Sequence, residues 1–276
     1  MKIKSHLFLL TLVIILFACK KKSAVTPPSY DLIVEGGINT FSTSQYIRLS
    51  QPALIPDKAP TPLNGATVTV NDGDTNTVFT EINSTGIYWA TMKNNQRYNQ
   101  AYTLSIIYQH KAYTATDTLF PVVPIDERHI PITFSLDQSL VRTTIPKHTF
   151  GALYPQQWLI TADKNTWDPG RLDENYPYSY SHPYGSPDAL NPLIQQNTII
   201  TSAIKDSLTV YKFSLSNTYA TFLYTVFQET DWRGILSGIP GNVKGNISGN
   251  ANGFFYARDV EMKRKSLADL IRQNQQ

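Results

Sequence analysis

Apolar and polar side chains alternate with period two through much of residues 32–119. The apolar positions are rich in β-branched and aromatic residues, and turn-forming residues separate the runs. This alternation is typical of strands with one buried face. Seven runs at such short spacing indicate an Ig-like β-sandwich rather than a β/α fold. The runs are Leu32–Val34, Tyr46–Leu49, Thr67–Val70, Val78–Ile82, Ile87–Ala90, Tyr102–Tyr108 and Ala112–Thr118.

The second half of the chain, after Pro121 and Pro124, is again β-rich. These prolines stiffen the chain and interrupt strand pairing, so we place a domain boundary there. Residues 217–231 depart from this pattern, because their apolar positions follow the i, i+3, i+4 spacing of a helix face. Ser216 or Asn217 can cap the start of that helix. The expected strands are Ile130–Leu136, Trp158–Ala162, Thr198–Ser202, Leu208–Leu215 and Gly253–Ala257.

The predicted fold class is therefore mainly β, with two β-rich domains. The first domain is the sandwich of residues 31–120. The second, residues 125–262, is a β-sandwich that carries the amphipathic helix of residues 217–231. Residues 263–276 are polar in composition and are interpreted as a tail.

The first residues follow a third pattern. Lys2 and Lys4 precede a largely apolar run from Leu7 to Ala18, and three lysines starting at Lys20 close it. The run has 12 residues, whereas a membrane-spanning helix needs roughly 20. We therefore expect residues 1–18 to be a cleaved signal peptide.

The end of the run, Leu16-Phe17-Ala18-Cys19, resembles the lipoprotein box of bacteria. In such a box Leu16, Phe17 and Ala18 are recognised by the signal peptidase, and Cys19 becomes linked to diacylglycerol and fatty acids such as palmitate. Residues 19–30 are then a short lipidated tether. We expect this anchor to hold the protein in the outer membrane, on either the periplasmic face or the cell surface.

The balance of charged residues and the search for catalytic or metal-binding motifs limit the classes of function that this protein can have. Without the signal peptide the chain has 22 basic and 21 acidic residues, a near balance that argues against a nucleic-acid partner. No two histidines stand at metal-ligand spacing, and no nucleophile elbow or phosphate loop is present. The sequence predicts no catalytic residue, no metal and no cofactor. Four carboxylates lie near Trp167 in the sequence, Asp163, Asp168, Asp173 and Glu174. A glycan hydrolase needs two carboxylates that face each other across a cleft. If no two of them do so, we expect these residues to cap turns.

Residues 176–187 carry four tyrosines among prolines that limit regular strand pairing. Tyrosine offers a large contact area at low entropic cost, so recognition loops favour it. The other interpretation is a loop whose rings pack on the protein itself. The candidate contacts with a glycan or protein ligand are Trp167, Tyr176, Tyr178, Tyr180 and Tyr184.

Several short motifs, taken in order, resemble the Bacteroidota lipoproteins catalogued as domain of unknown function 4249. The resemblance implies a transthyretin-like first domain, an outer-membrane anchor and genes beside those of TonB-dependent receptors, and it assigns no catalytic residue. We therefore expect a non-enzymatic accessory or ligand-capture module, with a structural or adhesion spacer and a glycan hydrolase as alternatives. The motifs are Leu32–Gly36, Asn64–Val70, Gly86–Tyr88, Tyr102–Leu104, Leu215–Tyr219, Pro240–Ile247 and Gly253–Ala257.

Intact-mass analysis of the membrane-extracted protein tests the anchor. We expect a chain that begins at Cys19 and carries acyl groups on it, because the apolar run is too short to hold the protein in the membrane by itself. A freely diffusing chain with a bare thiol at Cys19 would contradict the assignment.

Overall fold

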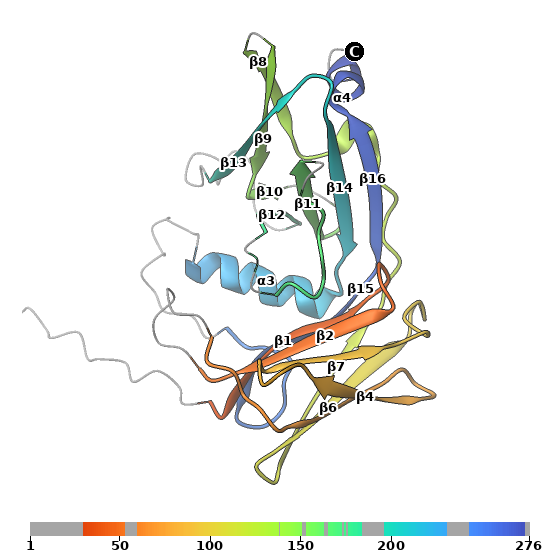
Figure 1. The fold of residues 1–276 in the computed structure, drawn as a ribbon, viewed down its shortest axis with the longest axis vertical. Coiled ribbons are helices and arrows are strands. Elements are labelled where there is room, and N and C mark those ends of the chain that lie inside the picture. The colour runs from red at the N-terminus through yellow and green to blue at the C-terminus, as the bar shows by residue number, and fades with distance from the viewer. Residues whose placement is uncertain are drawn as a thin grey trace, which may run out of the picture.

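The computed structural model describes residues 30–52, 60–137, 139–150, 153–162, 165–172, 174, 176–183, 196–230 and 243–273. The fold is mainly β, as predicted, and its strands form two lobes that lie one above the other (Figure 1). Within the described ranges, no helix combines the length and hydropathy that crossing a bilayer requires. The predicted signal peptide, the lipidation site with its recognition residues, and Tyr184 lie outside the described residues.

The first lobe is an eight-stranded sheet that contains all seven strands predicted for residues 32–119. The order of its strands is β15-β1-β2-β5-β4-β3-β6-β7, and β15 pairs with β1 in parallel. The sheet curls until its two edge strands approach one another, so it is nearly closed. The strands are β1 Leu32–Asn39, β2 Ser44–Ser50, β3 Thr67–Asn71, β4 Asn76–Glu81, β5 Ile87–Thr91, β6 Ala101–Tyr108, β7 Lys111–Thr118 and β15 Ala251–Arg258.

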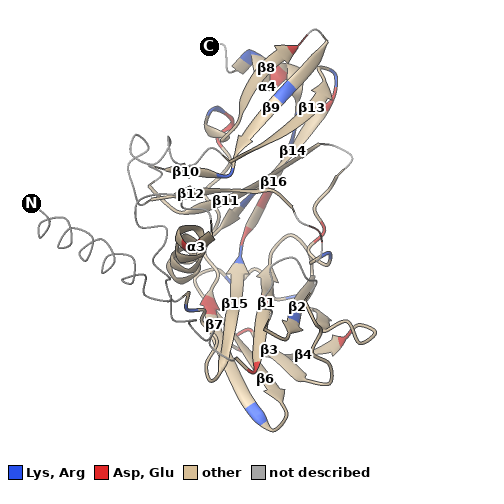
Figure 2. Ribbon diagram, turned by 90° about the vertical axis from the view of Figure 1, so that its left-hand side faces the viewer, with Lys and Arg blue, Asp and Glu red and all other residues tan. Residues whose placement is uncertain are grey.

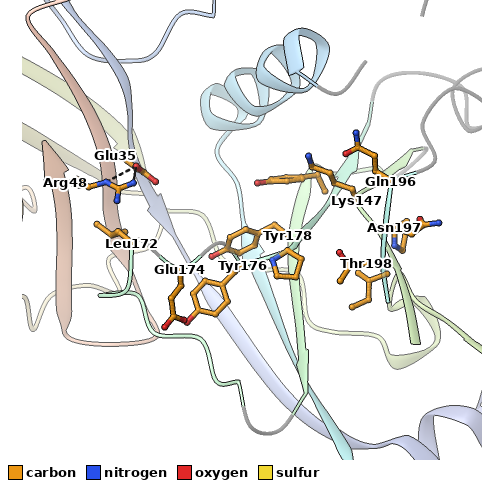
Figure 3. Close-up of a pocket in the computed structure, with 14 residues that line it drawn as sticks. Glu35, Arg48, Lys147, Leu172, Glu174, Tyr176, Tyr178, Gln196, Asn197 and Thr198 are labelled. Atoms are coloured by element: carbon orange, nitrogen blue, oxygen red, sulfur yellow. Dashed lines mark hydrogen bonds and ion pairs between the residues drawn. The ribbon is translucent and has the colours of Figure 1, made fainter. Parts of the chain in front are cut away.

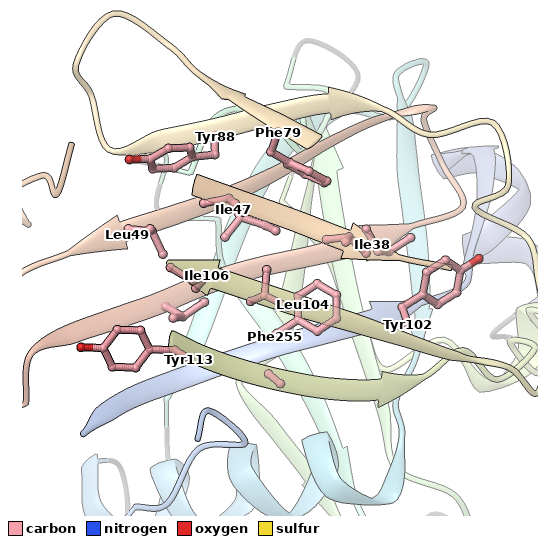
Figure 4. Packing of buried hydrophobic residues seen from close by; sticks show 14 of the residues in the cluster. Ile38, Ile47, Leu49, Phe79, Tyr88, Tyr102, Leu104, Ile106, Tyr113 and Phe255 are labelled. Carbon is pink, nitrogen blue, oxygen red and sulfur yellow. The ribbon is translucent and has the colours of Figure 1, made fainter. Parts of the chain in front are cut away.

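The alternating residues of these strands form the core of the first lobe. Leu104, Ile106 and Phe255 are fully buried, while their neighbours in the strand are more exposed. Their side chains meet inside the curled sheet (Figure 4). Because burial of apolar area contributes about 25 cal/mol per Å², this core accounts for the stability of a lobe in which no disulfide can form between cysteines.

The gap between edge strands β7 and β15 is bridged by side chains from the loop before β15. The Asn246 side chain accepts a hydrogen bond from Phe255 N at 3.0 Å and donates to Phe255 O at 2.8 Å and Thr116 O at 3.2 Å. Asp117 of β7 accepts from Ala257 N at 2.9 Å, and burial raises the pKa of this carboxyl to about 6. Backbone groups that would otherwise be unpaired edge groups are thereby satisfied.

Gly253 lets β15 lie against β1. Its φ is +98°, and a Cβ at this position would lie 1.9 Å from Val34 O. Only glycine avoids this overlap, because it has no Cβ and adopts a positive φ at little cost. The Gly253 position in the sequence is therefore required by strand pairing.

The second lobe has two sheets, ordered β10-β12-β11-β14-β16 and β13-β9-β8. Val141 and Ile145 from the smaller sheet share a buried core with Trp158, Ile160 and Val210 from the larger one. The elements are η1 Glu127–His129, β8 Thr133–Asp137, β9 Leu140–Pro146, β10 His148–Phe150, β11 Gln156–Ala162, β12 Tyr178–His182, β13 Asn197–Ala203, β14 Ser207–Ser214, β16 Val260–Ser266 and α4 Leu267–Gln273.

The predicted helix is present as α3, Asn217–Thr230, and it lies between the two lobes (Figure 1). Ser216 caps it, because its Oγ accepts a hydrogen bond from Tyr219 N at 3.1 Å. Tyr219 packs on β15, with its ring centroid 4.7 Å from that of Phe254. At the other end Phe227 contacts the second lobe. The apolar stripe therefore faces both lobes rather than a single sheet.

The structure differs from the predicted division of the chain in three places. The last predicted strand, β15, pairs with β1 of the first lobe although it was placed in a domain of residues 125–262. The predicted polar tail starts inside β16 and continues into α4, where Leu267 and Leu270 are buried. Part of the tyrosine segment, expected as a loop, is strand β12. Charged residues along β16 and prolines around β12 obscured these elements in the sequence.

One residue, Asp259, separates β15 from β16 and connects the two lobes. Its Oδ1 accepts hydrogen bonds from the hydroxyls of Thr40 at 2.6 Å and Tyr98 at 3.2 Å, and its Oδ2 accepts from Val122 N at 2.8 Å. Its backbone N–H donates to Ser214 Oγ at 2.8 Å. The carboxylate of this buried residue therefore joins the first lobe to the connection between the lobes, and its backbone N–H joins both to the second lobe.

Replacing Asp259 with Asn is expected to lower the free energy of unfolding by about 3 kcal/mol, because an amide nitrogen would face a donor and the charge-assisted hydrogen bonds would be lost. Urea unfolding of the purified variant measures this. Asp137→Asn, at an exposed position of β8, is the matched control and should change stability by less than about 0.5 kcal/mol. Equal effects in the two variants would contradict the role of Asp259.

Candidate functional site

A cleft with a volume of about 810 Å³ lies between the lobes. Glu35 of β1 and Arg48 of β2 form the wall from the first lobe, where their side chains make an ion pair at 2.5 Å. The opposite wall comes from the second lobe and includes Lys147, Asn197 and Thr198. In Figure 3 the predicted contact residues Tyr176 and Tyr178 lie between these two walls.

The tyrosines reach the cleft because β12 has the period of a strand. Tyr178 and Tyr180 project from one face of β12, while Ser179 and Ser181 project from the other and are buried. Both tyrosines are half-buried and line the cleft. Burial raises the pKa of Tyr178 far above its ordinary value, so its hydroxyl stays protonated. The cleft therefore presents aromatic faces and neutral hydroxyl groups.

The carboxylates near the cleft are held by neighbouring groups. Glu174 pairs with Arg171 at 2.7 Å, and hydrogen bonds from Tyr176 and Arg171 lower its pKa. Asp168 accepts a hydrogen bond from Gly170 N at 2.8 Å, the geometry of a turn cap. The remaining two predicted carboxylates, at positions 163 and 173, lie outside the described residues.

Trp167 is placed differently from the tyrosines. It is buried, and its ring lies 5.0 Å from that of Phe213 and 5.8 Å from that of Tyr211 in the second lobe. Phe41 from the first lobe packs on it at 5.3 Å. Trp167 therefore contributes to packing between the lobes and reaches a ligand only through the inner cavity described next.

A smaller cavity of about 190 Å³ adjoins the cleft and shares with it the lining residues Glu35, Leu172, Glu174, Tyr176, Tyr178 and Tyr180. Arg258, the last residue of β15, lines this cavity and is 4% exposed. Its Nη1 donates to Gln157 Oε1 at 2.6 Å, and Gln157 Nε2 donates to the Tyr180 hydroxyl at 3.2 Å. The inner cavity is thus built around a buried arginine.

The structure also brings together His148 and His182, which the sequence did not connect. Strands β10 and β12 pair in parallel, and the two imidazoles share a hydrogen bond of 2.9 Å between Nδ1 and Nε2. The Phe227 ring of α3 covers both, at 4.2 Å and 5.1 Å. Burial and then the charge of His148 lower the pKa of His182 from its ordinary 6.5 to about 4.

No third metal ligand joins this histidine pair from the described part of the chain. Among the described residues, no group of three or more His, Cys, Asp or Glu side chains could hold an ion. Only the alternation of residues 178–182 gave a sequence signal for the pair, since it places His182 on the face of β12 that carries Tyr180.

Comparison with known proteins then places the chain in a family. The model of the family described as domain of unknown function (DUF4249) matches residues 23–264. The chain belongs to this family. The match covers both lobes, the cleft and Arg258, so the site described above lies within the domain that defines the family. No curated protein matches the chain.

The histidine pair predicts how stability depends on pH. Between pH 6.5 and 4 the His182 side chain gains a proton in the unfolded chain but stays neutral in the folded chain. The free energy of unfolding therefore falls as the pH is lowered. The expected contribution of His182 is about 3 kcal/mol over this window. Urea unfolding at several pH values should show a flatter dependence for His182→Gln, which stays neutral.

His110→Gln is the control, because His110 is exposed on the first lobe. This variant should keep the pH dependence of the unsubstituted protein. A His182→Gln protein that loses as much stability on acidification as the unsubstituted protein would contradict the prediction.

Proposed function

We propose that this protein is a non-enzymatic, lipid-anchored module of the outer membrane that holds a ligand in the cleft between its lobes. The tyrosine-lined cleft carries the proposal. A site of this volume with aromatic walls and a few polar groups is the usual form of a ligand pocket in proteins. The ligand is a glycan or a segment of protein, both of which present faces on which tyrosine rings pack.

The chemistry of the two candidate carboxylates that the structure describes supports binding rather than hydrolysis. A glycan hydrolase needs one carboxylic acid with a raised pKa that can protonate the leaving group. The pKa of Glu174 is instead lowered by its hydrogen bonds, and Asp168 caps a turn. A glycan in this cleft would therefore meet carboxylates suited to accepting hydrogen bonds.

The surface supports a partner that is not a nucleic acid. Among the described residues, the Lys and Arg positions in Figure 2 are distributed along the ribbon of both lobes, with Asp and Glu positions among them. We further propose that the module works beside a TonB-dependent receptor, which would take the ligand from the cleft. The family resemblance and the expected anchor at Cys19 support this partner. If the cleft is empty in cells and contacts no receptor, the protein is a spacer or adhesion module.

Site-specific photo-cross-linking in the lipidated full-length protein tests this function. A benzophenone amino acid placed at Tyr176, on the cleft wall, is expected to give an adduct with a TonB-dependent receptor in native cells. Mass spectrometry identifies the adduct. The same amino acid at Val78, which is 65% exposed on β4, is the matched control and should give no such adduct.

Two results would overturn the receptor proposal. One is the absence of a receptor adduct from Tyr176 when expression and lipidation are normal. The other is equal adduct formation from Tyr176 and Val78, which would indicate crowding in the membrane rather than contact with the cleft.

A further inference from the structure

The guanidinium of Arg258 carries a positive charge that no acidic side chain among the described residues pairs with. It is 96% buried, and none of the Asp or Glu side chains in the described part of the chain forms an ion pair with it. Its Nε has no hydrogen-bond partner there either. Arginine stays charged at all physiological pH values, so it does not escape the cost of burial by losing a proton.

The protein compensates this charge only in part. The Arg258 guanidinium carbon lies 3.9 Å from the ring centroid of Tyr256 and 4.7 Å from that of Phe213, which are cation–π distances. Gln157 holds Nη1 through its amide oxygen. These contacts orient the guanidinium but supply no negative charge.

Tyrosine side chains line the same cavity. Tyr178, Tyr219 and Tyr256 line it, and their hydroxyls make no hydrogen bond to any residue that the structure describes. Three carboxylates also line the cavity, and each is paired with an arginine: Glu35 with Arg48, and Asp168 and Glu174 with Arg171. Among the described residues of the lining, Arg258 is therefore the cation that no carboxylate balances. A carboxylate fits this set, since it takes two parallel hydrogen bonds from an arginine and further ones from hydroxyls.

We propose that Arg258 binds the carboxylate of an acidic ligand in the inner cavity, while the remainder of the ligand lies along the tyrosines of the cleft. This inference rests on the proposed function and adds the chemical class of the ligand. Two arginines line the cavity, Arg258 and Arg171. The charge of Arg171 is balanced by Glu174 and Asp168, whereas no described acidic side chain pairs with Arg258. One unbalanced positive charge suits a carboxylate, which carries a single negative charge, better than a phosphate. The volume of about 190 Å³ holds the acidic end, and the adjoining cleft holds the ring or chain.

Titration of the membrane-extracted full-length protein in detergent tests the proposal. The probes are benzoate, D-glucuronate and succinate, with benzamide and D-glucose as neutral counterparts and inorganic phosphate as a different anion, all at constant ionic strength. Binding is measured by isothermal titration calorimetry, because the chain has four tryptophans and the fluorescence of Trp167, which lines the cavity, does not separate from theirs. We expect at least one carboxylate to bind saturably, and the neutral counterparts and phosphate not to bind.

Substitutions connect binding to Arg258. Arg258→Gln should weaken the bound carboxylate at least tenfold, and Arg258→Lys should weaken it less, since lysine keeps the charge but loses the planar fork. Arg142→Gln makes the same change of charge at an exposed position of β9 and should leave binding unchanged. If Arg258→Gln does not fold, Tyr178→Phe and Tyr219→Phe remove single hydroxyls and should each weaken binding several-fold.

Three results would overturn the proposal: no carboxylate binding up to about 20 mM, beyond ordinary weak affinities; phosphate binding as tight as that of the carboxylates; or full carboxylate affinity in a folded Arg258→Gln protein. The receptor test is separate. A receptor adduct at Tyr176 without carboxylate binding would refute the ligand class alone, whereas carboxylate binding without the adduct would refute the receptor alone.

Discussion

The arrangement of the whole molecule depends on the carboxylate of Asp259. This residue lies where one continuous stretch of chain leaves the sheet of the first lobe as β15 and enters the second lobe as β16. Its two oxygens accept hydrogen bonds from Thr40, Tyr98 and Val122, which come from different parts of the first lobe and of the connection. A buried charge is stable only when several donors surround it. This polar network therefore holds the lobes together at the point where the chain passes between them, and the packing of Phe41 on Trp167 and of α3 on both lobes adds to it.

The cleft follows from this junction. Arg258 precedes Asp259 directly, so the network that holds the lobes together also places the guanidinium at the base of the inner cavity. The helix α3 lies beside the same junction, where Tyr219 packs on Phe254 and Tyr256. Residues from the first lobe, the second lobe and the helix thus converge on one cavity. Among them Arg258, Tyr178 and Tyr219 each pack on a neighbouring aromatic ring. Such preorganisation suits recognition, because little conformational entropy remains to be lost on binding.

Local patterns in the sequence account for much of the fold and little of the site. All seven strands of residues 32–119 and helix α3 were predicted, since burial of one face leaves a period of two or 3.6 that can be read directly. The tyrosines at 176, 178 and 180 were identified as candidate contacts from composition, and the structure places all three on the cleft. Trp167 was grouped with them, but it packs between the lobes because Phe41 and Phe213, distant in sequence, meet around it.

The sequence alone determined the mainly β class, the helix and the family, because each of these is a property of local runs or of short motifs in order. Tertiary structure alone decided that β15 joins β1, that His148 meets His182 across 34 positions, and that Arg258 is buried with no acidic partner in the described part of the chain. These facts depend on contacts between segments far apart in the chain, and the cost of bringing such segments together is repaid only by the complete fold. No short run of residues records them.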